Sequence, residues 1–254
     1  MTFELTLTKY LKGDDEVEAI VPEGVTVVAE SAFANIRLLK RVVLPEGVTT
    51  IKSWAFSSCM DLEEIQLPST LRMIEGGAFR DCSKLKHITI PEGVESLGER
   101  AFVRCRRLHS IDLPETLSSI GIHCFQHCTT LDAITWPAGV TTVPEAAFQG
   151  CHALAQVNLP DTLEAIDTDA FANCKGLKAI ELPESLVWMG PGCFRGCVSL
   201  EGITVPDSVP SIEAEAFAGC SALAFASLPT DLDYRDKTAF EDCPALESLT
   251  VRMA

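Results

Sequence analysis

The chain has 254 residues, of which 47% are hydrophobic, so it can bury a sizeable core. Its formal net charge of −16 disfavours nucleic-acid binding and binding to an anionic membrane surface, because both depend on Lys and Arg. The sequence has no run of 18 apolar residues, so we expect no transmembrane helix. The first residues lack a basic segment followed by an apolar one, so we expect no secretory signal and a cytoplasmic protein. A cell-surface or secreted location is the alternative if a signal peptide has been removed.

Residues 1–21 are expected to form a capping hairpin ahead of the main pattern. Phe3, Leu5 and Leu7 alternate with polar residues, and the same alternation returns over residues 17–21. Between them the sequence KGDD at residues 12–15 is a turn signal.

From Pro22 onward a 23-residue unit recurs ten times without insertion. It reads L-P-x-x-[VL]-x-x-I-x-x-x-A-F-x-x-C-x-x-L-x-x-I-x. The prolines that mark its step are Pro22, Pro45, Pro68, Pro91, Pro114, Pro137, Pro160, Pro183, Pro206 and Pro229. An apolar pattern repeated at a fixed period predicts a solenoid, in which each coil buries its apolar face against its neighbours.

Two local periods alternate inside each unit. Ile65 and Leu67 alternate with polar residues, which predicts a short strand. The spacing of four between Ile51, Ala55 and Cys59 predicts one or two helical turns, which should end at left-handed residues before the ladder cysteines. The proline and glycine between these parts fit the second and fourth places of a type I turn. The expected fold is an α/β solenoid, a right-handed superhelix of about ten coils with a parallel β-sheet on the concave face and short helical turns on the convex face.

The last unit departs from the consensus, as terminal repeats do. Ala226 replaces the strand isoleucine, and Arg235 replaces the isoleucine after the proline. We therefore expect a single domain over residues 1–254, with regular repeats over 22–228 and a degraded C-terminal coil over 229–254.

The segments L-x-x-I-x-L-P and A-F-x-x-C-x-x-L resemble the leucine-rich repeat proteins, and among them the BspA-like class. The resemblance covers about residues 17–251. Thr70 and Gly93 occupy the column where the general leucine-rich pattern has Asn or Cys. The resemblance implies a binding scaffold, often for surface or host-facing interactions, and no enzymatic activity.

The eleven cysteines are expected to be buried free thiols. Nine of them, from Cys59 to Cys243, share one column, and side chains in one column point the same way rather than toward one another. Cys124 and Cys193 stand in the alanine column. The sequence HCFQHC at residues 123–128 looks like a zinc motif, but its cysteines belong to the scaffold and its histidines to variable, exposed columns. We therefore predict no metal site. An acidic residue follows seven of the prolines, and we interpret this column as solvated turn residues, with a cation or basic partner as the alternative.

Catalysis finds little support in the sequence. There is no nucleophile elbow, phosphate loop or dinucleotide fingerprint. His109 and Asp112 are three apart on one expected strand, so their side chains should face opposite sides. We predict no enzyme, no catalytic residue and no cofactor.

Three groups of residues are candidates for partner binding because the repeat leaves them variable. The first is a local basic group, the second is a polar pair of columns on the expected concave face, and the third is an aromatic edge near the C-terminal end. Their members are Arg100, Arg104, Arg106, Arg107 and His109; Asp112, Asn158 and Glu181; and Trp188, Phe225 and Tyr234.

The predicted function is a non-catalytic protein-interaction scaffold that presents a concave repeat surface. The first alternative is a surface or secreted adhesin-type module that binds a host protein or a glycan. The second is a self-associating structural module. The expected partner is a protein, with a glycan second, and we expect no nucleic acid, no membrane insertion, and a monomer or weak self-association.

Overall fold

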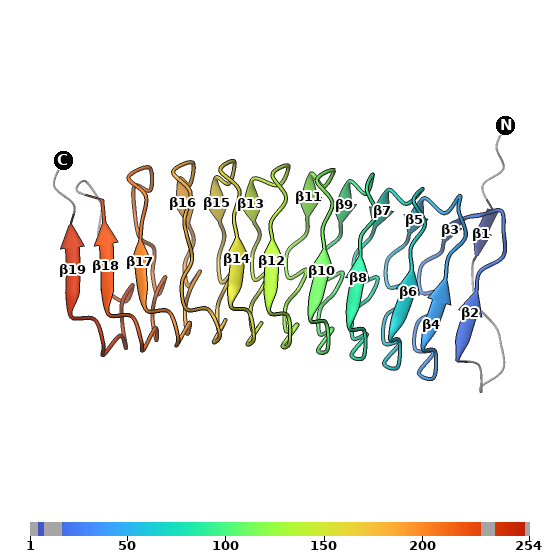
Figure 1. The fold of residues 1–254 in the computed structure, drawn as a ribbon, viewed down its shortest axis with the longest axis horizontal. Helices are drawn as coiled ribbons and strands as arrows, with labels where there is room; N and C mark the ends of the chain where they lie inside the picture. Colours follow the sequence, from blue (N-terminus) through green and yellow to red (C-terminus); the bar gives the residue numbers. More distant parts are fainter. Residues whose placement is uncertain (1–4, 8–16, 230–236, 252–254) are drawn as a thin grey trace. The chain divides into compact units, whose positions relative to one another are not determined.

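The computed structural model describes residues 5–7, 17–229 and 237–251. The chain forms two compact units, residues 1–129 and 130–254. Each unit is built from stacked coils joined by parallel strands. The fold is a β-solenoid, as the 23-residue repeat predicted, with about nine turns where about ten coils were expected. The coils form two series of strands, which we call pre-proline and post-proline strands after their place in the repeat (Figure 1).

In unit 1 the post-proline strands form one six-stranded sheet in the order β1-β3-β5-β7-β9-β11, and the pre-proline strands form two sheets, β2-β4-β6 and β8-β10. The pre-proline strands are β2 (Glu18–Ile20), β4 (Arg41–Val43), β6 (Glu64–Gln66), β8 (His87–Thr89) and β10 (Ser110–Asp112). The post-proline strands are β1 (Leu5–Leu7), β3 (Val25–Val28), β5 (Thr50–Ile51), β7 (Met73–Ile74), β9 (Ser96–Leu97) and β11 (Ser119–Ile120).

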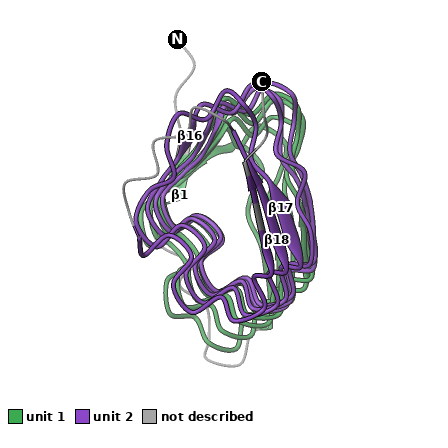
Figure 2. Cartoon of the chain, turned by 90° about the vertical axis from the view of Figure 1, so that its left-hand side faces the viewer, with its two compact units in different colours: residues 1–129 green, residues 130–254 purple. Residues whose placement is uncertain are grey.

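In unit 2 the sheets are β12-β14 and β17-β18-β19 in the pre-proline series, and β13-β15-β16 in the post-proline series. The pre-proline strands are β12 (Ala133–Thr135), β14 (Gln156–Asn158), β17 (Gly202–Thr204), β18 (Phe225–Leu228) and β19 (Ser248–Val251). The post-proline strands are β13 (Thr142–Val143), β15 (Ala165–Ile166) and β16 (Trp188–Met189). Seen along the coils of this unit, β16 lies on the side opposite β17 and β18 (Figure 2).

The pre-proline strands turn an apolar middle residue inward and its two neighbours outward. In β6, Ile65 is buried while Glu64 and Gln66 are exposed. Strands pair in parallel with a register step of one repeat, so that Arg41 lies opposite Glu64. Equivalent residues of successive coils therefore form straight columns, which confirms the predicted organisation of this face.

The predicted helical turns are wrong, since the described residues contain no helix. In the segment around Phe56, alternate amides donate to the next coil, as Phe56 N–H does to the carbonyl of Ala78 at 2.8 Å. The intervening amides close four-residue turns instead, such as that of Ser57 N–H to the carbonyl of Trp54. Trp54 (φ 60°) and Ser58 (φ 60°), four residues apart, both have a left-handed backbone. This conformation interrupts any helix. Buried residues four positions apart thus lie in a series of consecutive turns and not in a helix.

The left-handed positions before the ladder cysteines are confirmed. Asn35, Asp81 and Asn173 all have a positive φ, as do Gly150 and Gly219. Asparagine, aspartate and glycine adopt this conformation at the lowest cost.

The turn after Pro45 differs from the type I turn that the sequence suggested. Val48 N–H donates to the carbonyl of Pro45, so the proline stands first and Gly47 third, with φ 103°. A positive φ at the third place is the mark of a type II turn. In the next coil the hydroxyl of Thr70 accepts a hydrogen bond from Gly47 N–H and donates to the carbonyl of Val48, both at 2.9 Å. Threonine in one turn thereby satisfies the backbone of the preceding turn.

The core of each unit is a stack of phenylalanines. The rings of successive coils have centroids 4.7–5.7 Å apart and interplanar angles of 3–17°. Stacked aromatic pairs contribute about 0.5–1.5 kcal/mol each beyond the area they bury. Among the described residues, every buried side chain is apolar or a cysteine.

The chain termini differ in part from the prediction. β1 and β2 belong to different sheets, and each pairs in parallel with a later strand, β3 and β4 respectively, so the hairpin predicted for residues 1–21 does not describe them. At the other end β19 pairs with β18. The single-domain organisation stays a prediction. Within the described ranges, no helix has the length and apolar character needed to cross a membrane.

Candidate functional site

The outward face of the pre-proline strands carries the variable columns. In unit 1, β8 and β10 present His87, Thr89, Ser110 and Asp112, all exposed. In unit 2, Asn158 is exposed at the end of β14. Within unit 1, His87 lies in register with Ser110 and Thr89 with Asp112.

A polar cluster joins β8 and β10 that sequence reasoning missed. His87 Nδ1 lies 2.8 Å from Ser110 Oγ, and His87 Nε2 lies 3.0 Å from Thr89 Oγ1 and 3.3 Å from Asp112 Oδ2. Thr89 also donates to Asp112 at 2.9 Å. The sequence analysis compared Asp112 with His109 on the same strand, whereas the register of one repeat pairs it with His87. The cluster is open to water, which competes for each of these hydrogen bonds.

Two residues of the basic group of unit 1, Arg100 and Arg104, pair with acids, as does Arg80 of the preceding coil. Arg80 Nε lies 3.1 Å from Asp81, and Arg104 lies 3.9 Å from the same carboxylate. Arg100 pairs with Glu99. These contacts occupy the turn segments, and exposed pairs of this kind contribute little to stability.

The remaining basic candidates lie elsewhere on the coil. Arg106 and Arg107 are exposed in the bend after Cys105, and exposed His109 immediately precedes β10. The structure therefore spreads the five predicted residues over three parts of one coil and does not collect them on one strand face.

The predicted aromatic edge is divided by the fold. Trp188 lies in β16 and Phe225 in β18, which belong to different sheets on opposite sides of the coil (Figure 2). Both side chains are exposed. Tyr234 lies outside the described residues. Trp188 and Phe225 therefore do not form one contact surface.

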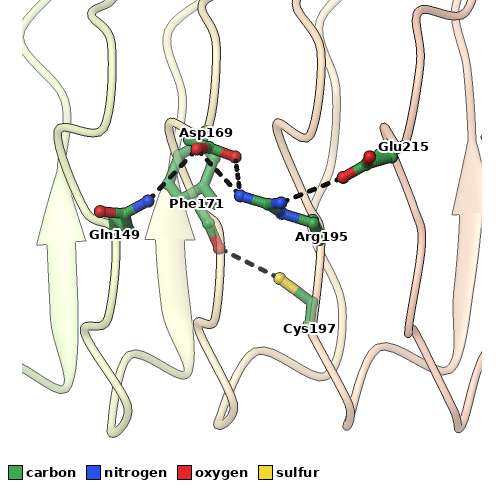
Figure 3. A network of polar contacts seen from close by, with 6 residues as sticks. All are labelled: Gln149, Asp169, Phe171, Arg195, Cys197 and Glu215. Atoms are coloured by element: carbon green, nitrogen blue, oxygen red, sulfur yellow. Dashed lines mark hydrogen bonds and ion pairs between the residues drawn. The ribbon is translucent and has the colours of Figure 1, made fainter.

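The cysteine ladder is confirmed as a column of free, packed thiols. All eleven cysteines are free, ten are buried, and Cys243 is half-buried. Eight thiols of the main column donate to the phenylalanine carbonyl of the preceding coil, as Cys197 does to Phe171 at 3.2 Å (Figure 3). Burial raises the pKa of Cys59 to about 12 and raises the pKa of Cys174 well above its ordinary range. Protonated, buried thiols are unreactive.

The His-Cys sequence at residues 123–128 follows the scaffold. Cys124 and Cys128 are buried, while His123 and His127 are half-buried at left-handed positions, and so less exposed than predicted. In the part of the chain that the structure describes, no three His, Cys, Asp or Glu side chains come together as metal ligands.

An ion-pair network crosses the turn segments of unit 2 (Figure 3). One guanidinium nitrogen of Arg195 donates to both oxygens of Asp169, at 2.9 and 3.0 Å. The other nitrogen donates to Glu215 at 3.0 Å, and Gln149 donates to Asp169 at 3.3 Å. The network links successive coils at the surface of unit 2.

Two grooves lie on the pre-proline face of unit 2, on either side of residues 179–181. One, of about 300 Å³, includes Glu181, Gly202 and Phe225 in its lining. The other, of about 540 Å³, includes Asn158 and Glu181. The structure thus brings three sequence-predicted candidates, Asn158, Glu181 and Phe225, to one stretch of surface.

Parallel strands repeated every 23 residues around columns of leucine, phenylalanine and cysteine define a leucine-rich repeat protein. The family model described as the BspA type leucine rich repeat region (6 copies) matches residues 14–132 and 141–253, and the chain belongs to this family. Among curated proteins, none matches the chain.

Solved structures of bacterial leucine-rich repeat proteins resemble the chain. A leucine-rich repeat protein of T. pallidum is 32% identical with a TM-score of 0.64, over 67% of this chain and 81% of that one. A leucine rich cell surface protein of Faecalibacterium prausnitzii is 27% identical with a TM-score of 0.50, over 94% and 79%. A leucine-rich repeat protein of Eubacterium ventriosum shares the fold, with 18% identity and a TM-score of 0.60 over 98% and 78%.

Proposed function

We propose that this protein is a non-catalytic interaction scaffold that binds a partner protein through the outward face of its pre-proline strands. The observation that carries the proposal is the contrast between the two sides of each strand. The inward residues of the described strands are apolar in every coil and nearly all are buried, whereas the outward columns are largely exposed and differ in residue type from coil to coil. In this proposal these strands line the concave side of a right-handed superhelix. Rigid strands then hold the variable side chains in fixed register, which lowers the entropic cost of binding.

The proposal is tested by crosslinking the protein in its source cell and identifying captured partners by mass spectrometry. Asn158→Arg places a bulky charge on the pre-proline face, and Val187→Arg places the same charge at an exposed position beside β16 as a control. A specific partner should be lost with Asn158→Arg and kept with Val187→Arg. A partner that crosslinks equally to both variants, or that is lost with the control alone, contradicts the proposal.

A second candidate function is a surface module that binds a host protein or a glycan. The similarity to a cell surface protein of F. prausnitzii supports it. Fractionation of the source cell distinguishes the two, because the surface module requires the intact chain at the cell surface or outside the cell, whereas the cytoplasmic scaffold requires it in the soluble interior. Light scattering over a concentration series tests the self-associating alternative, which a strict monomer would contradict.

A further inference from the structure

The pre-proline series of unit 2 lacks a strand at residues 179–181, between β14 and β17 (Figure 1). The amides of residues 179–182 donate no hydrogen bond within the described structure. The other side of the same coil is intact, since Ala165 pairs with Trp188, and Phe171 N–H donates to the carbonyl of Cys193 at 2.8 Å. In this coil the loss of pairing is therefore confined to the pre-proline face, where the amides of residues 179–182 have no acceptor among the described residues.

Phe225 forms one wall of the smaller groove beside this segment. Its side chain is 49% exposed, which is unusual for a phenylalanine in a chain whose other described phenylalanines stack in the core. A Cβ atom on Gly202 would lie 2.1–2.2 Å from two carbons of the Phe225 ring, so the ring rests directly on the glycine backbone. The glycine thus lets the ring lie across β17, toward Ile180 and Glu181, which line the same groove.

The same groove also carries acidic side chains. Glu181 and Glu184 line the groove with Phe225, both are exposed, and neither forms an ion pair in the part of the chain that the structure describes. Glu181 also borders the second groove, so its carboxylate stands between the two. An exposed aromatic ring that shares a groove with unpaired carboxylates is a suitable environment for a cation.

We propose that this groove binds an arginine side chain from an extended segment of a partner protein, an inference that rests on the proposed scaffold function. The planar guanidinium stacks on the face of Phe225 while its N–H groups donate to Glu181. The unpaired amides of residues 179–182 donate to carbonyls of the bound segment. The net charge of −16 attracts a basic segment, whereas a neutral glycan gains nothing from this charge.

The probe is a fluorescein-labelled peptide, Ser-Thr-Arg-Thr-Ser-Gly, measured by fluorescence anisotropy against a twin in which Gln replaces Arg. The arginine peptide should bind at least about tenfold more tightly than its twin. Glu181→Gln and Phe225→Leu should each weaken arginine-peptide binding about threefold to tenfold, because one removes the carboxylate charge and the other the aromatic face. Gly202→Ala should weaken it as well, since the added methyl group displaces the ring.

Asp161→Asn is the matched control, because it removes one exposed charge from the same unit outside the groove, and it should leave the affinity unchanged. Equal binding of the arginine and glutamine peptides overturns the proposal, as does equal weakening by Asp161→Asn and Glu181→Gln. Displacement of the peptide by neutral maltooligosaccharide would also overturn it and indicate a glycan site. If the groove variants leave an Asn158-dependent crosslinked partner unaffected, the groove inference fails while the scaffold function stands; if no partner depends on Asn158, the scaffold function fails.

Discussion

Raising the pH above 9 should unfold this protein, because its core contains protonated thiols. Eight buried cysteines have a raised pKa, namely Cys59, Cys82, Cys105, Cys124, Cys174, Cys193, Cys197 and Cys220. Desolvation is the main cause in each, since burial penalises the thiolate. For Cys59 the value rises from 9.0 to about 12. This stabilisation is complete below pH 9, where thiols are protonated in both states, and is lost as the pH rises from 9 toward 12.

The magnitude follows from proton linkage. Each unfolded thiol that ionises lowers the free energy of unfolding by about 1.4 kcal/mol per pH unit above its ordinary pKa. At pH 10, one unit above 9.0, eight thiols together lower it by about 11 kcal/mol. A typical domain is stable by about 5–15 kcal/mol, so the midpoint of alkaline unfolding is expected near pH 10.

The assay is urea unfolding followed by tryptophan fluorescence at a series of pH values from 8 to 10.5. Above pH 9 the free energy of unfolding should fall steeply with pH. The slope should correspond to several protons released on unfolding. The double variant Cys59→Ala, Cys220→Ala should lower that slope by about two equivalents. A slope below one proton equivalent refutes the reasoning. Rapid reaction of the native thiols with a disulfide reagent at pH 8 refutes it equally, since the thiols would then be exposed.

Three substitutions test other parts of the structure by urea unfolding. Phe171→Ala should lower the free energy of unfolding by about 3–5 kcal/mol, because it opens a cavity in the ring stack, and a loss below 1 kcal/mol would contradict the packing. Thr70→Val keeps the shape but removes the hydroxyl that bridges two backbone groups of the preceding turn, at a cost of about 1–3 kcal/mol; an unchanged stability would show that water satisfies those groups. Arg195→Met should lower the free energy of unfolding by less than about 1 kcal/mol despite its contacts with Asp169 and Glu215, because the pairs are partly exposed. A loss above about 2 kcal/mol would show that the network stabilises the fold substantially.

The fixed repeat made the buried columns predictable. Equivalent positions must have equivalent environments when every coil stacks on the next, so Phe171 and Cys174 were assigned to the core from spacing. The same logic identified Asn35 and Asp81 as left-handed, because few residue types tolerate that conformation.

The local conformation between these positions was not predictable in the same way. Apolar residues four positions apart fit a helix. They also fit a series of turns in which the amides donate hydrogen bonds alternately to the same coil and to the next coil. The choice depends on hydrogen bonds between coils, such as that of Phe56 N–H to Ala78, which no local pattern contains.

By itself the sequence determined the solenoid, its period and which residues are buried, since a constant 23-residue step requires every coil to repeat the same packing. The tertiary structure alone decided which variable residues meet. It joined His87 to Asp112 across two strands, separated Trp188 from Phe225, and brought Phe225 into one groove with Glu181. These outcomes depend on the register between coils and on the path of individual side chains, and a glycine at position 202 decides the path of the Phe225 ring.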